Sequence, residues 1–264
     1  GFSALFGTPL AATVFAIEVV MVGVVHYSAL VPCTVAALTA FEVAHLCGGH
    51  AESFPLHNIP EFALGGALKI AILALLCAVL SVIFCKTLHG AEHIYKKYIK
   101  NPYLRIFVGG VLVIVLSKVL GTTDYLGGGM NIVERAVEGE VVWAAFILKL
   151  LFTAVSLGAG FKGGEIVPTL FVGGTFGCLF GQLIGFSPSL CAACGMIALF
   201  SAVTNSPLAS LVLGFELFGF EGMPYYLIAI AIGYMESGYF GLYHSQTVKY
   251  SKMEPEEINQ KIKE

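Results

Sequence analysis

The sequence predicts an all-α polytopic membrane protein built on an internal repeat, and three observations carry this prediction. The 264-residue chain is 57% hydrophobic and 12% charged, with a mean hydropathy of +0.86, whereas about a quarter of the residues of a soluble domain are charged. Apolar runs recur along its length, and several approach the roughly 20 residues that a helix needs to cross a bilayer. The third observation is a pair of similar segments, residues 2–18 and 200–216.

The apolar runs, and the proline, glycine and polar residues between them, predict where helices and loops lie. Pro9, Pro168 and Pro207 each open an apolar run, as proline does in the first turn of a helix. The segment 48–61 is polar and proline-bearing, and 121–130 contains three consecutive glycines, so both are expected to be loops. Helices are predicted at 9–25, 28–47, 62–98, 103–120, 140–157, 168–184, 188–203, 207–219, 223–238 and 243–250.

Charge indicates the orientation of the chain. Basic residues collect around one predicted turn, at Lys86, Lys96, Lys97, Lys100 and Arg105. Lys- and Arg-rich connections stay on the cytoplasmic side, so this turn is expected to face the cytoplasm. Residues 1–250 are interpreted as a transmembrane domain and 251–264 as a soluble tail. The net charge of −3 gives no indication of nucleic-acid binding.

The two similar segments share a proline and a glutamate at the same spacing. FSALFGTPLAATVFAIE ends at Glu18, and FSAVTNSPLASLVLGFE ends at Glu216. Repeats in hydrophobic chains are typical of transporters, whose sites lie between the halves and use broken helices. The two carboxylates are expected either to serve in transport or to accept the amides of a neighbouring helix end.

The stretch GFKGGEIVPTLFVGGT, residues 160–175, predicts an anion site. A broken backbone at membrane depth is tolerated where it lines a cavity, and the first amides of the following helix lack internal partners. The candidate anion-binding residues are Gly163, Gly164, Glu165 and Ile166. Close helix packing is the alternative reason for glycines in membranes, and it is the preferred one for Gly65, Gly66, Gly173 and Gly174.

These motifs resemble those of the CLC family of voltage-gated chloride channels and transporters. GFKGGEIVPTLFVGGTFG is similar to its second glycine-rich anion motif, GGGMNIVERAVEG to the loop and short helix between its halves, and the repeat segments to its paired helices. The resemblance implies a CLC-type inverted repeat of tilted, broken helices and a homodimer with one pore per subunit. The helices flanking Glu18 and Glu216 would form the dimer interface. Amides of Glu165 and Ile166 would coordinate the anion, and Tyr243 corresponds to the family's pore tyrosine.

Some positions depart from the family pattern. Glu165-Ile166 stands where a hydrophobic pair is common, and the resulting GGE resembles the fluoride-exporting branch. Val19 occupies the position of an internal glutamate found in proton-coupled members. The glycine motif's counterpart, with the gating glutamate, is expected upstream of Gly1, so the chain is expected to be truncated at its N-terminus. Glu165 either contributes an ionisable group or supplies only its amide, and Lys162 either balances it or lies at the cavity mouth.

The resulting functional prediction is a multi-pass protein of the cell membrane, surrounded by lipid, that carries chloride or fluoride as a channel or an anion/proton exchanger. No catalytic residue, cofactor or metal is expected. Two alternatives remain open: a non-transporting membrane remnant or scaffold, and a metallopeptidase through HGAEH, in which His89 and His93 share a helix face. Lys149, inside an apolar run, is expected either to snorkel to an interface or to pair with a carboxylate.

Overall fold

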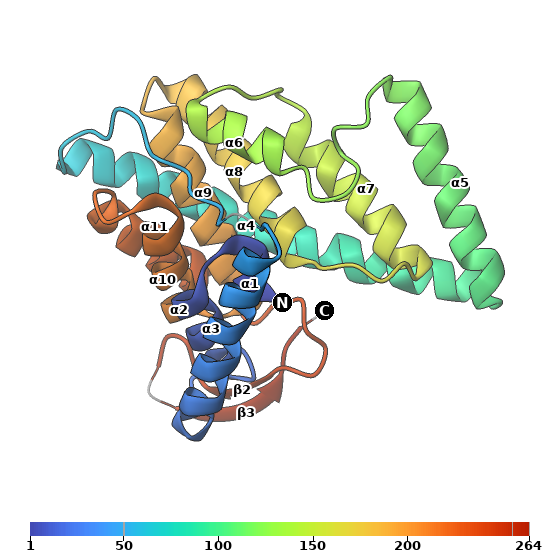
Figure 1. Cartoon of the computed structure of the whole chain (residues 1–264), viewed down its shortest axis with the longest axis horizontal. Helices are drawn as coiled ribbons and strands as arrows, with labels where there is room; N and C mark the ends of the chain where they lie inside the picture. Colours follow the sequence, from blue (N-terminus) through green and yellow to red (C-terminus); the bar gives the residue numbers. More distant parts are fainter. Residues whose placement is uncertain (50, 255, 264) are drawn as a thin grey trace.

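A computed structural model describes residues 1–49, 51–254 and 256–263 and is predominantly helical. In Figure 1 the long helix α4 runs along much of the longest axis, α5 stands at one edge, and a small sheet lies apart from the helices at the lower end. The helices are α1 (Phe2–Phe6), α2 (Pro9–Glu18), η1 (Tyr27–Ala29), α3 (Leu30–Leu46), α4 (Leu64–Tyr98), α5 (Pro102–Leu120), α6 (Met130–Glu138), α7 (Ala145–Ala159), α8 (Ile166–Ile184), α9 (Pro188–Thr204), α10 (Pro207–Phe218) and α11 (Met223–Glu236).

Among the described residues, four helices are long and apolar enough to cross a membrane. These are the segments Tyr27–Leu46, Leu64–Tyr98, Pro102–Leu120 and Ile166–Ile184. The first and third are almost wholly unburied inside the chain, so their apolar side chains face outwards. This arrangement suits helices whose outer surface lies in lipid, where apolar side chains need no protein cover.

Helix α9 forms the centre of the core. Every residue from Ser189 to Thr204 is buried, and the helix packs against α4, α8, α10 and α11. Its sequence explains this position, because it carries no charge and is apolar on all sides, which is the pattern of a fully enclosed helix.

Close packing of α8 on α9 depends on glycine. A Cβ at Gly173 would lie 2.5 Å from the carbonyl oxygen of Gly195, and one at Gly174 would lie 2.9 Å from Met196 Cγ. The packing interpretation of these two glycines is therefore confirmed. It also holds for Gly66, whose Cβ would meet the Tyr225 hydroxyl at 2.6 Å, but it is wrong for Gly65, where no atom lies within 4 Å.

Several predicted bounds differ from the structure. The first helix ends at Glu18 and is followed by a short strand, β1 (Met21–Val22), and α1 forms a separate turn before it. Helix α7 begins at Ala145 instead of residue 140. The predicted loop at 121–130 is confirmed up to Gly129, where α6 begins. The loop 48–61 is also without helix or strand in its described part; residue 50 lies outside the described residues.

The predicted helix at 243–250 is wrong. This segment is a loop leading into β2 (Thr247–Tyr250), which pairs in parallel with β1 and antiparallel with β3 (Glu257–Lys261). Thr247, Val248 and Tyr250 are residue types that favour strands. The segment YHSQTVKY is short and mostly polar, so it gave no periodicity to separate strand from helix, and the partner strand β1 lies more than 200 residues away.

Candidate functional site

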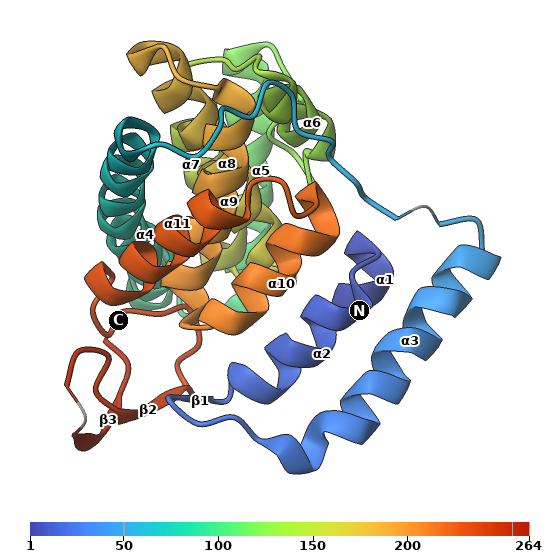
Figure 2. The ribbon, with the colours of Figure 1, turned by 90° about the vertical axis from the view of Figure 1, so that its left-hand side faces the viewer.

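The repeat helices α2 and α10 cap each other. Glu216 accepts hydrogen bonds from the amides of Leu10 at 3.0 Å and Ala11 at 2.7 Å, and Glu18 accepts them from Leu208 at 3.0 Å and Ala209 at 2.8 Å. The end of each helix thus lies at the start of the other, so the two run antiparallel and side by side (Figure 2). The capping interpretation of both carboxylates is confirmed, and it gives the repeat its inverted arrangement.

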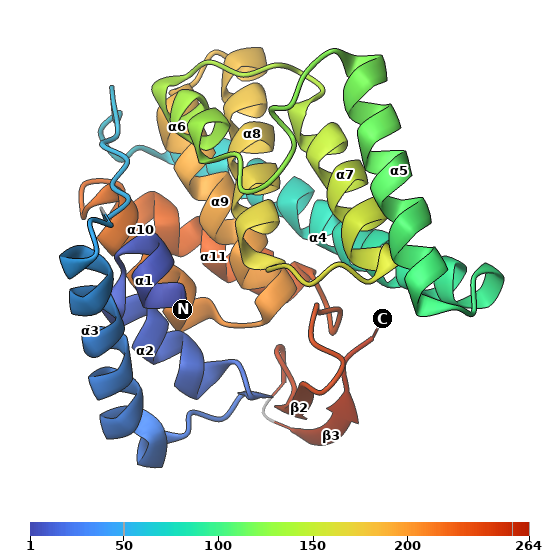
Figure 3. The same ribbon diagram turned by 45° about the vertical axis from the view of Figure 1, so that its right-hand side comes forward.

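The glycine-rich stretch forms a break between α7 and α8 (Figure 3). Helix α7 ends at Gly160, which has a left-handed backbone with φ 102°. Residues 161–164 are irregular, and α8 begins at Ile166 with Glu165 as its N-cap. The helix therefore starts two residues before Pro168, which occupies the third position of its first turn.

Backbone amides at this break are available to a ligand. In the part of the chain that the structure describes, the amides of Gly164, Glu165, Ile166 and Val167 donate no hydrogen bond. Thr169 closes the first turn, because its amide and hydroxyl both donate to the Glu165 carbonyl, at 3.1 and 2.9 Å. The start of α8 thus presents unpaired N–H groups and the positive end of the helix dipole.

Gly163 and Gly164 are not required by backbone conformation. Neither has a positive φ, in contrast to Gly160, whose left-handed backbone favours glycine. Both residues are exposed, and a Cβ at Gly164 would meet no atom within 4 Å. Glycine at 164 therefore leaves open space beside the amides of the break.

One side of the break faces a cavity of about 350 Å³. Its lining includes Gly163, Gly164 and Val167 from the break and Lys149 from α7. The Lys149 side chain is buried and donates to the carbonyl oxygens of Tyr125 at 3.3 Å and Gly127 at 2.6 Å. Neither prediction for Lys149 is correct, since it neither snorkels nor pairs with a carboxylate. The glycine loop before α6 supplies its acceptors, and its amine places positive charge beside the break.

A second cavity, of about 190 Å³, borders the break at Glu165. Lys162 and Gly163 line it from the break, and three titratable side chains line it from elsewhere: His89, Glu92 and His244. The HGAEH motif therefore faces this cavity through His89 and Glu92. Within the described residues no three His, Cys, Asp or Glu side chains come together to hold a metal ion.

Tyr243 lies near the break, as the resemblance implies. It is partly buried against the cluster of Phe84, Val172 and Leu199, with its ring 6.5 Å from that of Phe15. The next residue, His244, lines the smaller cavity together with Gly163 and Glu165. The structure thus brings together residues 163–166 and Tyr243, which are some 80 positions apart in the sequence.

Four membrane-length helices, an antiparallel pair of repeat helices and a broken-helix site with exposed amides define a multi-pass helical membrane protein of the inverted-repeat type. Comparison with known proteins makes this class specific. The chain belongs to the CLC family, because the family model described as "Voltage gated chloride channel" matches residues 1–238.

Individual relatives agree with this assignment. The chain is 33% identical to a chloride/fluoride channel protein of Pseudomonas syringae pv. tomato, over 98% of this chain and 59% of the relative. It is 28% identical to the voltage-gated ClC-type chloride channel ClcB of Citrobacter koseri, over 88% of this chain and 58% of the relative. The chain thus spans about three fifths of these relatives.

Solved structures match as well. The crystal structure of a CLC-type fluoride/proton antiporter superimposes with a TM-score of 0.88 and 29% identity, over 94% of this chain and 63% of that one. A eukaryotic CLC transporter shares the fold, with a TM-score of 0.63 and 20% identity, over 88% of this chain and 41% of the other. The predicted fold class, all-α with a CLC-type inverted repeat, is confirmed.

Proposed function

We propose that the protein containing this chain transports a small anion, fluoride in preference to chloride, in exchange for protons. The anion would be held at the start of α8 by the amides around Gly163, Gly164, Glu165 and Ile166, with the Tyr243 hydroxyl as a further donor. The observation that carries this proposal is the set of unpaired, accessible amides at a break bordered by two cavities.

Amide donors suit a transported ion. They and the helix dipole stabilise negative charge without a full positive charge in contact with it, so the ion is bound weakly enough to leave. Lys149 lies in the lining of the larger cavity and would raise the local concentration of anions before they reach the break.

Glu165 supports the choice of proton exchange over passive conduction. A charged carboxylate beside an anion repels it, whereas a protonated one does not, so occupancy by the anion and by a proton would favour each other. The GGE motif distinguishes this chain from the hydrophobic pair common in the family. The fluoride/proton antiporter is named for the proposed exchange, and the chloride/fluoride channel protein is named for the two candidate anions.

We also propose which faces of the protein contact a second copy and which contact lipid. Exposed apolar side chains on and next to the repeat helices, Leu10, Val20, Leu208 and Phe220, are suited to an interface between two copies, which would make the protein a homodimer. The outward faces of α3 and α5 would contact lipid, and residues 251–264 would lie outside the bilayer. Transport by this route needs no covalent chemistry, so the protein would not be an enzyme.

The proposal is tested by flux measurements on the whole gene product reconstituted into liposomes. We expect fluoride efflux to exceed chloride efflux. Gly164→Ala is expected to slow fluoride efflux about tenfold, equivalent to about 1.4 kcal/mol, because its methyl group would fill the space beside the amides. Folding should be unchanged, since that methyl group meets no protein atom.

Gly65→Ala is the matched control, because its Cβ would also meet no atom within 4 Å and it lies far from the break in the sequence. Normal flux in Gly164→Ala would contradict the placement of the anion. An intact, folded protein without flux of either anion would favour the scaffold alternative.

A further inference from the structure

The cavity at Glu165 adjoins another cavity closer to the basic end of α4. This outer cavity, of about 310 Å³, is lined by His89, Glu92, His93, Lys96 and His244. His89, Glu92 and His244 also line the inner cavity, which contains Glu165. These three titratable side chains therefore form the wall that the two cavities share.

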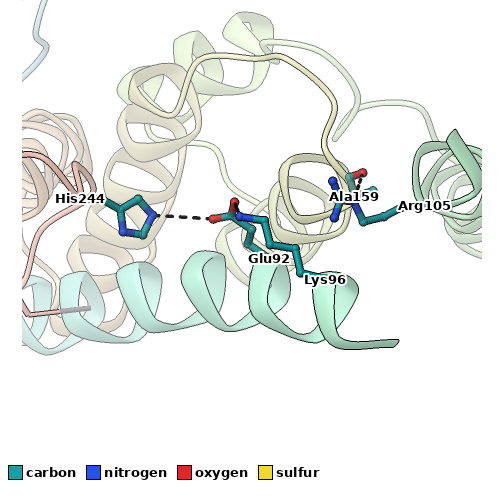
Figure 4. Close-up of polar contacts among 5 residues, drawn as sticks. All are labelled: Glu92, Lys96, Arg105, Ala159 and His244. Carbon is teal, nitrogen blue, oxygen red and sulfur yellow. Dashed lines mark hydrogen bonds and ion pairs between the residues drawn. The ribbon is translucent and has the colours of Figure 1, made fainter. Parts of the chain in front are cut away.

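The three side chains contact one another across the wall. His244 Nε2 lies 3.7 Å from a carboxylate oxygen of Glu92, and the other oxygen of Glu92 pairs with Lys96 (Figure 4). The rings of His89 and His244 lie 4.3 Å apart between centroids. The side chains of His244 and Glu92 are 52% and 39% exposed, so water reaches the outer members of the group.

One hydrogen bond determines which ring nitrogen of His89 carries hydrogen. Its Nε2 lies 3.2 Å from the carbonyl oxygen of Leu242, and a carbonyl oxygen can only accept, so Nε2 carries hydrogen. In the neutral ring Nδ1 is then the acceptor nitrogen. On the inner side, His244 and Glu92 share the lining of the inner cavity with Glu165.

We propose that His89, Glu92 and His244 carry protons between the outer cavity and Glu165. This inference rests on the proposed anion/proton exchange and deepens it, by naming the route that loads the carboxylate. Histidine suits the task because its ordinary pKa lies close to physiological pH.

The step balances without any further reactant. A water or hydronium ion in the outer cavity gives a proton to an imidazole nitrogen of the His89–His244 pair, and Glu92 stabilises the resulting imidazolium. The imidazolium then releases the proton, directly or through water in the inner cavity, to a carboxylate oxygen of Glu165. The imidazole returns to its neutral form and Glu165 becomes a neutral acid.

His244 faces charged side chains on two sides. From α4 it faces Glu92, His89 and, through Glu92, Lys96; from the break between α7 and α8 it faces Glu165 and Lys162 across the inner cavity.

The alternative explanation is structural: contacts among His89, Glu92 and His244 only hold the loop that contains His244 against α4. Proton and fluoride fluxes, measured separately in liposomes containing the whole gene product, distinguish the two. With His244→Gln we expect proton flux to fall on the order of 100-fold, which is the scale contributed by a positioned proton-transfer group. The residual proton flux of this variant should depend less on pH than the flux of wild type. His244→Lys keeps a positive charge beside Glu92 without a group that titrates near neutral pH, so it should restore the docking but not the proton flux.

His93→Gln is the matched control, because His93 lines only the outer cavity, and His45→Gln on exposed α3 is a distant one. Both should leave the ratio of proton to fluoride flux unchanged. If wild type exchanges both ions and His89→Gln and His244→Gln do so normally, the relay is wrong while the transport function stands. Rescue of proton flux by His244→Lys would favour simple fastening and overturn it. Fluoride movement without protons in wild type would reject the relay together with proton exchange and leave anion transport standing, whereas no anion flux at all would reject the proposed function.

Discussion

Glu18 and Glu216 illustrate how single charged residues are retained in an apolar interior. Each carboxylate accepts two amide hydrogen bonds from the first turn of the opposite repeat helix. Those amides have no partner within their own helix, and the positive end of the helix dipole favours the negative charge. The charge thus satisfies a structural need, and the default suspicion that an intramembrane carboxylate is functional does not apply to these two.

Removing either charge should destabilise the protein without abolishing the site at α8. Glu18→Gln leaves one donor-bearing nitrogen facing an amide and weakens the other bond, and hydrogen bonds to charged groups contribute about 1.5–3 kcal/mol each. We expect the free energy of unfolding, measured by heat or denaturant in detergent, to fall by an amount of that order, and to fall similarly for Glu216→Gln. Glu138→Gln, at an exposed end of α6, should change little; equal losses in all three would argue against specific capping.

Residue types and their spacing were sufficient to predict the unpaired amides at the start of α8 and the caps, because both depend on local rules for helix ends. They were insufficient for Lys149 and for His244. The acceptors of Lys149 lie in a loop 22–24 positions away, and the neighbours of His244 come from α4, about 150 positions earlier. Such pairings depend on tertiary packing, which no local pattern encodes.

Elements pack closest where α8 crosses α9. Gly177 is the tightest point, since a Cβ there would lie 2.1 Å from the carbonyl oxygen of Cys191, and Gly195 on the facing helix approaches Gly173 similarly. The obstacles are backbone atoms, which cannot move aside as a flexible side chain would. The start of α8 carries the candidate anion site, so this contact also fixes the position of the site relative to the core.

Gly177→Ala should therefore separate the two helices. Overpacking in a dense core costs about 1–3 kcal/mol, and we expect a loss of at least that size, with reduced anion flux as the start of α8 shifts. Gly90→Ala in α4 is the matched control, because its Cβ would meet nothing within 4 Å and alanine favours helix. A variant as stable as wild type would mean that α8 and α9 can move apart without consequence.

Element prediction succeeded for long apolar helices and failed for the C-terminal sheet. Helices α4, α5 and α9 appear close to their expected bounds because their length and composition leave few alternatives. Strand β2 is only four residues long, and its pairing partners decide its structure. The start of α8 was expected at Pro168, but the first turn accommodates proline at its third position as well, because the amide there needs no intrahelical partner.

At the scale of the whole molecule, the C-terminal segment ties together parts that are distant in sequence. Gln246 is buried and donates to the carbonyls of Val19 at 2.7 Å and Thr204 at 2.8 Å, while its oxygen accepts from Asn205. Further along, Lys252 donates to the Tyr234 carbonyl at 2.8 Å and to the Ser237 hydroxyl at 3.1 Å. These bonds hold the tail at the end of α11.

Docking of the tail should depend on pH through Lys252. Burial lowers the pKa of this lysine to about 7 from an ordinary value near 10.5. Between these values the unfolded chain binds more protons than the folded one, so stability should rise with pH from about 7 to 10, by at most about 1.4 kcal/mol per pH unit. Thermal unfolding in detergent at several pH values measures this slope.

Lys252→Met should flatten the dependence, whereas Lys249→Met, on the more exposed neighbouring strand, should retain it. An identical slope in wild type and Lys252→Met would assign the pH dependence to other groups.

The reciprocal caps also imply a delay during synthesis between the first repeat helix and the residue that caps it. The amides of Leu10 and Ala11 receive their partner only from Glu216, 206 and 205 positions later. At the ribosome's rate of 5–20 residues per second, the first repeat helix waits about 10–40 s for its cap. During that interval its start must be covered by water, lipid headgroups or the insertion machinery. The nascent chain is therefore expected to be most vulnerable to degradation before its second repeat helix emerges, and a message cut short before the codon for Glu216 would leave the start of the first repeat helix without its cap.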